Sequence, residues 1–277
     1  MPGRREIAPE TRWICLLVAA ILLAAVILLG IRPDRTDELF AWTITPEMTP
    51  LYLASAYGAG VYFFARGFLT SAWHHIAAGF PGIALFATLM LVATLLHFDK
   101  FNGGDAPTVA AVAFYAWVIV YILSPLLVGG VWLRNRGVDT GAPDPVDTVV
   151  PPSVRTGVRV AGGAMLAAAT VFFLLPQVAI DIWPWKLTPL TARIMASFIA
   201  ETGAIALVLS FDARWSAWRI LTQTAMLGAA LLLSGIARTW DVFDTGNPLT
   251  WGFLAAGAGT IAGAAALHVA MQRRLSR

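Results

Sequence analysis

Charged residues are scarce in this chain, and cysteine is almost absent. Charged residues make up 13% of the 277 residues, whereas an ordinary soluble domain carries about 25%. This scarcity argues against a soluble globular protein. The Lys and Arg residues sit at the ends of apolar runs and form no basic stripe, which argues against a nucleic-acid partner. The single cysteine, Cys15, excludes an intramolecular disulfide.

Motifs for metal, nucleotide and hydrolase chemistry are also missing. Cys-x-x-Cys, His-Glu-x-x-His and Gly-x-x-x-x-Gly-Lys do not occur, so we expect no metal and no nucleotide cofactor. Gly-x-Ser-x-Gly is absent too, which removes the signature of the hydrolase nucleophile elbow. The four histidines are His74, His75, His97 and His268. No two of them are expected at matching mid-membrane depth, so a haem held by two histidines is disfavoured.

Long apolar runs fill most of the chain, and hydrophobic residues make up 58% of it. Runs longer than about 18 residues can cross the bilayer core. Because these runs show no two-residue alternation, they predict helices and not the strands of a membrane barrel. We expect eight membrane spans, at about residues 13–31, 47–66, 73–97, 107–133, 157–176, 189–210, 216–238 and 248–271.

The two halves of the chain resemble each other. Six residues of the first half, Pro9, Arg12, Pro33, Trp42, Thr45 and Pro46, recur with the same spacing as Pro152, Arg155, Pro176, Trp185, Thr188 and Pro189. Ser71-Ala72-Trp73 likewise recurs as Ser216-Ala217-Trp218. Four spans in each half return the chain to its starting side, so the halves are expected to be parallel and not inverted.

The expected fold class is therefore all-α, a polytopic membrane protein made of two parallel four-helix tandem repeats. The repeats cover residues 1–133 and 157–277, and a Pro- and Asp-rich linker at 134–156 joins them. Most of the 19 Lys and Arg residues fall on the side of the termini, and short cytoplasmic loops carry such an excess. We expect a bacterial plasma-membrane protein with a cytoplasmic N-terminus, C-terminus and linker.

The repeated Trp-x-x-Thr-Pro signature has a structural and a functional interpretation. Thr45-Pro46 and Thr188-Pro189 are typical of a helix start, with Thr as the N-cap and Pro at the first helical position. Trp42 and Trp185 are then expected in the aromatic belt at the membrane interface. A ligand site on the outer face is the alternative, and the helix-start interpretation is the better supported one. Pro81 and Pro125 are expected to kink their helices.

Glu201 is the strongest candidate for a functional side chain. It lies near the middle of the predicted span 189–210, and its counterpart in the first half is Gly58. A carboxyl group at this depth is costly unless it is protonated or paired, and by default it indicates a functional site. A protonated acid that merely joins two helices by a hydrogen bond is the equally supported alternative. Arg193 lies too far along the helix for a direct pair, so we expect it to reach the lipid headgroups.

A repeated Phe-Asp-x-x-Asn signature supplies the remaining candidates for ligand or proton binding. Its polar members are Asp99 and Asn102 in the first half and Asp244 and Asn247 in the second half. Asn247 precedes a proline and is expected to cap a helix. The two aspartates join Glu38, Asp105, Asp181 and Asp241 on an acidic outer face. Such a face can concentrate cations, although a solvated rim is the simpler interpretation.

The run Trp-Pro-Trp-x-Leu-Thr-Pro-Leu-Thr-Ala-Arg at residues 183–193 resembles a stretch of uncharacterised multi-spanning membrane proteins, mainly of actinobacteria. The resemblance covers this run and the repeat around it. It implies a bacterial membrane protein and, because no activity attaches to that group, no site residues.

Three functions are compatible with these features. The first is transport or small-ligand binding between the repeats, with Glu201 binding a proton or a small solute. The second is a non-catalytic assembly or sensor role with a membrane-protein partner, favoured by the many Gly and Ala residues of the spans. The third and least supported is a lipid-modifying enzyme that uses Asp99, Asp244 and His97. The lipid bilayer is the expected surrounding in all three.

Overall fold

The computed structural model describes residues 6–103, 106–139 and 141–276, and Asp105 lies outside this part. The described residues form helices and no β-strand. The long helices are α1 (Pro9–Ile31), α3 (Met48–Leu69), α4 (Gly79–Leu96), α5 (Thr108–Asn135), α6 (Pro152–Leu174), α8 (Pro189–Leu209), α9 (Trp215–Arg238) and α10 (Pro248–Leu275). Two short helices, α2 (Thr36–Leu39) and α7 (Pro176–Ile182), follow α1 and α6, and four 3₁₀ turns are present: Pro33–Arg35, Trp73–His75, Phe98–Lys100 and Trp240–Val242.

Among the described residues, seven helices are long and apolar enough to cross a membrane: α1, α4, α5, α6, α8, α9 and α10. These helices also expose large apolar side chains, such as Leu126 at 76% and Trp13 at 64%, which a soluble surface rarely does over such an area. They indicate a membrane-embedded protein. Helix α3 coincides with the expected second span but is not among the seven, and it carries polar side chains such as Thr49, Ser55 and Arg66. The eighth span therefore stays a prediction.

Several helix boundaries differ from the sequence-based expectation. Helix α4 begins at Gly79 and not at residue 73, because Trp73–His75 forms a 3₁₀ turn. Pro81 therefore lies in the first turn of α4, where its missing N–H is not needed. The expected kink at Pro81 is absent, because this residue lies in the first turn and not in the helix interior. Pro125 does lie inside α5. Helix α6 begins at Pro152, so the connection between α5 and α6 comprises only residues 136–151.

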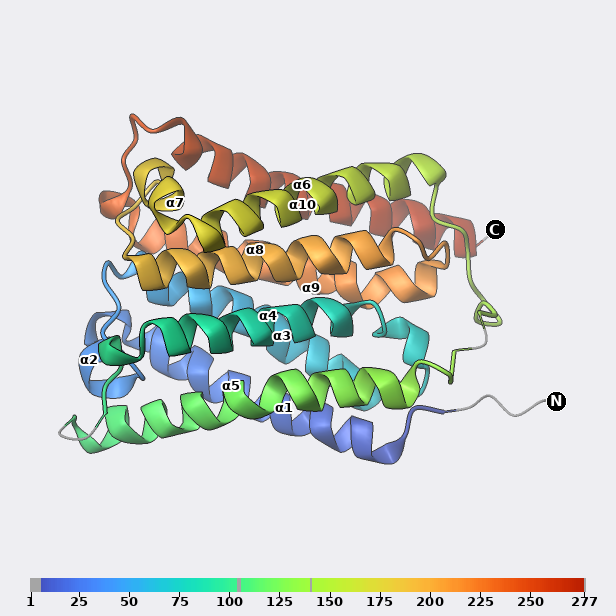
Figure 1. The fold of residues 1–277 in the computed structure, drawn as a ribbon. Helices are drawn as coiled ribbons and strands as arrows, with labels where there is room; N and C mark the ends of the chain where they lie inside the picture. Colours follow the sequence, from blue (N-terminus) through green and yellow to red (C-terminus); the bar gives the residue numbers. More distant parts are fainter. Residues whose placement is uncertain (1–5, 104–105, 140, 277) are drawn as a thin grey trace.

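The long helices run alongside one another, as Figure 1 shows. The start of α1, the end of α10 and the connection between α5 and α6 lie at one end of the bundle, which we call the terminal end. Helices α2 and α7 lie at the opposite end, the α2–α7 end. Helix α1 packs on α3 as α6 packs on α8, and α4 packs on α5 as α9 packs on α10. The first half meets the second through the pairs α3–α9 and α4–α8.

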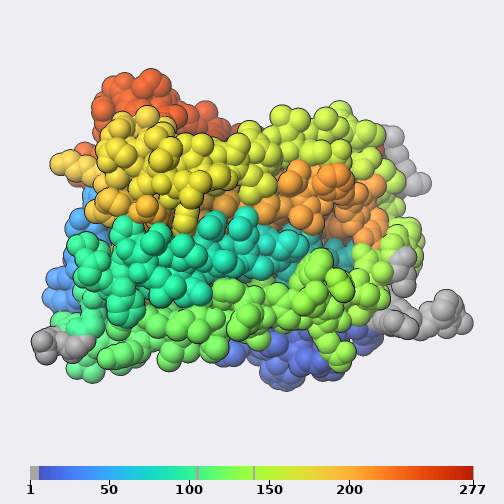
Figure 2. Space-filling model, viewed as in Figure 1, coloured from blue at the N-terminus to red at the C-terminus, as the bar shows by residue number. Residues whose placement is uncertain are grey.

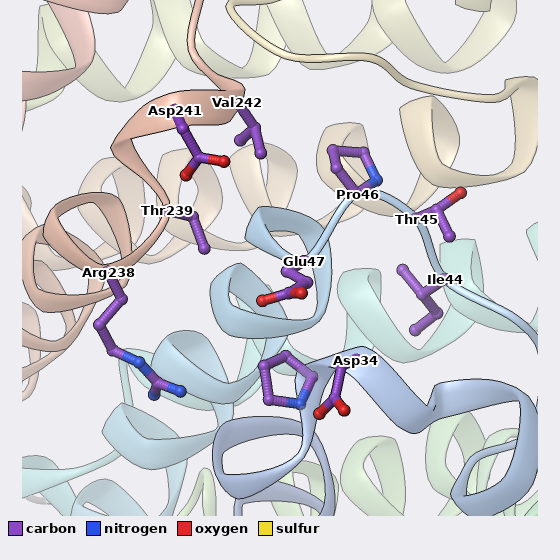
Figure 3. A pocket seen from close by; sticks show the side chains of 10 residues that line it. Asp34, Ile44, Thr45, Pro46, Glu47, Arg238, Thr239, Asp241 and Val242 are labelled. Carbon is purple, nitrogen blue, oxygen red and sulfur yellow. The ribbon is translucent and has the colours of Figure 1, made fainter.

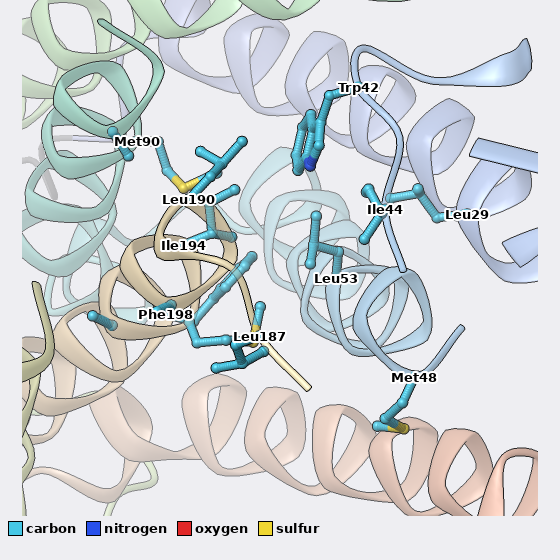
Figure 4. Close-up of a cluster of buried hydrophobic side chains, with 14 of the residues drawn as sticks. Leu29, Trp42, Ile44, Met48, Leu53, Met90, Leu187, Leu190, Ile194 and Phe198 are labelled. Atoms are coloured by element: carbon cyan, nitrogen blue, oxygen red, sulfur yellow. The ribbon is translucent and has the colours of Figure 1, made fainter. Parts of the chain in front are cut away.

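Buried tryptophans hold both ends of the bundle. Trp42 and Trp185 are 2% and 3% exposed and belong to the apolar cluster shown in part in Figure 4, with Leu29, Met90 and Phe198. A second cluster, around Trp73, Trp215 and Trp218, lies toward the terminal end. The expectation that Trp42 and Trp185 belong to a lipid-facing belt was thus wrong, because their rings pack against neighbouring helices inside the protein.

The two Thr-Pro steps differ in the structure. Thr188 caps α8, since its side chain accepts a hydrogen bond from the Thr191 backbone and Thr191 bonds back to it. Helix α3 instead begins at Met48 after the cap residue Glu47, and the Thr45–Pro46 bond is cis. The predicted helix start is confirmed at Thr188-Pro189 and wrong at Thr45-Pro46.

Candidate functional site

Glu201 lies near the middle of α8 and faces the first half of the chain. Its backbone oxygen meets Gly82 of α4. Its carboxyl group is close enough to interact electrostatically with the hydroxyl groups of Tyr52 and Tyr57 on α3 and of Tyr121 on α5. The side chain is half-buried and forms neither a hydrogen bond nor an ion pair with any residue that the structure describes. Glu201 thus places a carboxyl group, without a hydrogen-bond or ion-pair partner in the described part of the chain, where the two halves meet.

Aromatic residues of α3, α4, α5 and α8 pack against one another near Glu201. The phenolic oxygens of Tyr57 and Tyr121 are 3.0 Å apart, which joins α3 to α5 by a buried hydrogen bond. The ring of Phe198, one turn before Glu201, lies 4.6 Å from that of Phe86 and 5.8 Å from that of Tyr57. Phenol and carboxyl groups both hold exchangeable protons. The arrangement can therefore bind or pass on a proton in an otherwise apolar setting.

The contact between the halves is close-packed around Glu201. A Cβ atom on Gly82 would lie 2.7 Å from the backbone oxygen of Glu201. A Cβ atom on Gly58, the counterpart of Glu201, would lie 2.6 Å from a methyl carbon of Leu231 on α9. Figure 2 shows α4 as a band between α5 and α8 on one face of the protein. The Leu231 methyl can move aside, whereas the backbone oxygen at Gly82 cannot, so the tight constraint lies at Gly82. The acid is present in one half alone, because its counterpart is Gly58.

The Arg193 side chain forms hydrogen bonds within the protein. The expectation that it extends to the lipid headgroups was therefore wrong. Its Nη1 donates to His97 Nε2 at 2.8 Å, and its Nε donates to the backbone oxygen of Phe173 at 3.1 Å. Burial, with the nearby guanidinium as a second cause, lowers the pKa of His97. A neutral His97 is the form that can accept this hydrogen bond. The pair ties α8 to the end of α4.

The two asparagines of the repeated signature make matching contacts. Asn102 donates its amide to the backbone oxygen of Phe40 at 3.0 Å, and Asn247 donates to that of Trp183 at 3.3 Å. The Asn247 side chain also accepts from the Leu249 backbone and caps α10, as predicted. Both amides thus hold the loop that precedes α3 or α8.

The two aspartates of the signature have different surroundings. Asp99 is exposed and pairs with Lys100 at 2.8 Å, and this hydrogen bond lowers the pKa of its carboxyl group. Asp244 accepts a hydrogen bond from the Gly246 backbone at 2.9 Å. Within the described residues, no hydrogen bond or ion pair joins Asp99 to Asp244.

A pocket at the α2–α7 end lies between the two halves and was not expected from the sequence. Its volume is about 340 Å³, and Figure 3 shows the carboxyl groups of Asp34, Glu47 and Asp241 together with Arg238 around it. Arg238 donates to the backbone oxygen of Gly30 at 2.9 Å. Asp34 is paired with Arg32 at 3.1 Å outside this lining, so the carboxylates of Glu47 and Asp241 are the ones that favour a cation in the pocket.

A second polar cluster lies at the terminal end, where two histidines meet an aspartate of the α5–α6 connection. His75 Nε2 lies 2.8 Å from Asp144 Oδ2, and His74 Nε2 lies 3.4 Å from Asp144 Oδ1. His75 Nδ1 contacts Thr70 Oγ1 at 2.8 Å, and His74 Nε2 contacts Ser216 Oγ at 3.1 Å. Burial is the largest cause that lowers the pKa of His74. This donor set is the one in the described residues that can hold a metal ion.

No sequence pattern connects His74 and His75 to Asp144. These three residues match no metal-binding motif of fixed spacing. The His-His dipeptide followed by an acidic connection was the available signal. Only the packing of the connection against the turn at Trp73–His75 brings the three side chains together.

Comparisons with known proteins identify no relative of this chain. No family model, no curated protein and no solved structure matches the chain.

Proposed function

We propose that this chain is a bacterial plasma-membrane protein that moves protons, alone or with a small solute, between two parallel four-helix repeats. Glu201 is the group that binds the proton. One observation carries the proposal: a half-buried carboxyl group in the middle of α8 has no hydrogen-bond or ion-pair partner among the described residues. Such groups within membrane spans are costly and are typical of ion and proton pathways.

The helix contacts support the two-repeat, eight-span arrangement that this proposal includes. The main helix pairs of the first half, α1–α3 and α4–α5, have equivalents in the second half, α6–α8 and α9–α10. The two contacts between the halves, α3–α9 and α4–α8, exchange places under the repeat. The start of α1 and the end of α10 lie at one end of the bundle, as an even number of spans requires. We assign the terminal end to the cytoplasm because it carries most of the arginines.

The pocket at the α2–α7 end supports an entry side for cations. It takes Asp34 and Glu47 from the first half and Asp241 from the second half. Carboxylates at the mouth of a membrane protein raise the local concentration of cations. On this basis protons or a cationic solute enter there and reach Glu201 through movements of α4 and α8, which are in close contact in this structure.

Proteoliposomes test the proposal directly. The purified protein is reconstituted in liposomes loaded with a pH-sensitive dye, and the decay of an imposed pH gradient is recorded. We expect the wild-type protein to speed the decay over protein-free liposomes and Glu201→Gln to return it to the background, because the amide cannot release a proton. Glu10→Gln, at an exposed carboxylate of α1, is the matched control and should keep the wild-type rate. A wild-type rate equal to background, or full activity in Glu201→Gln, would contradict the proposal.

The outward face of α10 favours a second function, binding of a membrane-protein partner. Gly259 and Gly263 are exposed, and no atom lies within 4 Å of where their Cβ atoms would be. Two glycines at this spacing allow another helix to approach closely. Photo-crosslinking from Thr260 in native membranes should then capture a protein, and recovery of lipid adducts alone would contradict this function.

A further inference from the structure

The cluster of His74, His75 and Asp144 at the terminal end has no part in the proposed proton movement, and its side chains are potential metal ligands. Two imidazole rings from the turn before α4 and one carboxylate from the α5–α6 connection converge on one point. The three ligand atoms lie within 4.8 Å of one another, and all three residues are partly buried. The side chains are 10%, 15% and 21% exposed for His74, His75 and Asp144, so they are reachable from solvent yet held in place.

We propose that His74, His75 and Asp144 bind a divalent transition-metal ion, with zinc as the best match. Two imidazole nitrogens and one carboxylate oxygen are a ligand set that zinc accepts, with water in the fourth position. Zn–N and Zn–O distances are about 2.0–2.2 Å, so ligand atoms within 4.8 Å of one another need only small side-chain shifts to share one ion.

The surroundings hold the ligands in a suitable orientation. His75 Nδ1 contacts Thr70 Oγ1 at 2.8 Å, which leaves Nε2 directed at Asp144. The two rings meet edge to face with their centroids 4.4 Å apart, so each restricts rotation of the other. A hydrogen bond to the second ring nitrogen is the usual way in which proteins orient a histidine ligand.

The charges around the cluster favour a cation. The Arg214 guanidinium acts electrostatically on His74, but it donates to Asp139 at 2.7 Å and to Asp212 at 2.6 Å, which neutralise it. Asp147, which accepts from Ser216 Oγ at 2.5 Å, adds another carboxylate beside His74. The carboxylates of Asp139, Asp212 and Asp147 outnumber the Arg214 guanidinium, so these neighbours favour a divalent ion at the cluster.

A bound ion would join three parts of the protein. His74 and His75 belong to the first half, and Asp144 belongs to the connection. The connection is in turn fixed to the second half, where Val150 donates to the backbone oxygen of Ala213 and Trp215 donates to that of Thr148, both at 2.9 Å. The ion thus fixes the connection against both halves at the terminal end.

Zinc titration of the tag-free, full-length protein in detergent tests this site. Isothermal titration calorimetry should show one zinc ion per chain, and the melting temperature should rise with zinc and fall again with a chelator. His75→Ala and Asp144→Asn should each weaken binding about tenfold or more, since each removes a ligand. Asp99→Asn, at an exposed carboxylate of the opposite end, is the matched control and should bind as the wild type does.

Two further measurements on the wild-type protein test the proposed metal site without relying on a variant. Cobalt added in place of zinc should give the visible absorption of a four-coordinate site, and zinc should protect the connection at 136–151 from protease. Binding of less than one ion per chain, an octahedral cobalt spectrum, or equal affinity in His75→Ala would overturn the proposal and leave the cluster as hydrogen bonds only. Because the readouts are binding and stability, they do not depend on proton movement.

Discussion

Gly82 of α4 and Glu201 of α8 touch so closely that a Cβ atom at Gly82 would lie 2.7 Å from the Glu201 backbone oxygen. The same hypothetical Cβ would lie 2.5 Å from a side-chain carbon of Ile205. Real side chains essentially never approach this closely, and backbone atoms cannot move aside without shifting a helix. The contact between the halves therefore depends on the absence of a side chain at this point.

Gly82→Ala should destabilise the protein by about 1–3 kcal/mol, the usual cost of forcing an extra methyl group into a packed interior. Thermal unfolding in detergent measures the effect. Gly129→Ala on α5 is the matched control, because no atom lies within 4 Å of its Cβ position; alanine there should be neutral or slightly stabilising. Equal melting temperatures for the Gly82 variant and the wild type would show that α4 and α8 can separate at little cost.

Asn247→Ala should destabilise the protein by about 1–2 kcal/mol, because it removes the cap of α10 as well as the bond to Trp183. Asn102→Ala should cost less, since Asn102 bonds to Phe40 but caps no helix. Asn247→Asp keeps the cap acceptor and removes the amide donor, so it should fall between Asn247→Ala and the wild type. An Asn102 variant less stable than the Asn247 variant would contradict this assignment.

Acidification should weaken the contact between Arg193 and His97. Burial lowers the folded-state pKa of His97, so the unfolded chain takes up a proton first as the pH falls below about 6.5. The stability that neutral His97 contributes is therefore present above this value and is lost as the pH falls toward the folded-state pKa. Unfolding measured from pH 8 to pH 5 should show this loss. His97→Gln, which keeps an acceptor for Arg193, should show a smaller loss, and an unchanged pH profile would contradict the role of His97.

Thr49→Val should destabilise the contact between the halves by about 1–3 kcal/mol. Buried Trp185 donates its indole N–H to Thr49 Oγ1 at 2.9 Å, and valine would leave that donor without an acceptor. Thr170→Val is the matched control, since Thr170 is exposed and bonds only within its own helix. Chemical unfolding measures the free energy of unfolding of both variants. An equal loss of stability in the two would show that the hydrogen bond from Trp185 to Thr49 does not stabilise the contact between the halves.

Sequence periodicity was sufficient to predict helices over all eight expected spans, because backbone groups in an apolar run must be satisfied within the helix. It could not give the role of Trp42 and Trp185, whose position at helix ends suggested the lipid interface. Their rings are buried because Trp42 packs on Trp117 of α5 and Trp185 packs on Phe253 of α10. Nor could it predict the contact of Arg193, because its partner His97 lies 96 residues away in the sequence.

Local features could be predicted from the order of the amino acids: long apolar helices, the Asn247 and Thr188 caps, and an acid in the middle of α8. Which of these features meet depends on how the helices and loops pack. The phenols around Glu201 come from α3 and α5, and the carboxylate beside His74 and His75 comes from the α5–α6 connection. Helix formation depends on neighbours along the chain, whereas both candidate sites depend on side chains that packing brings together from distant segments.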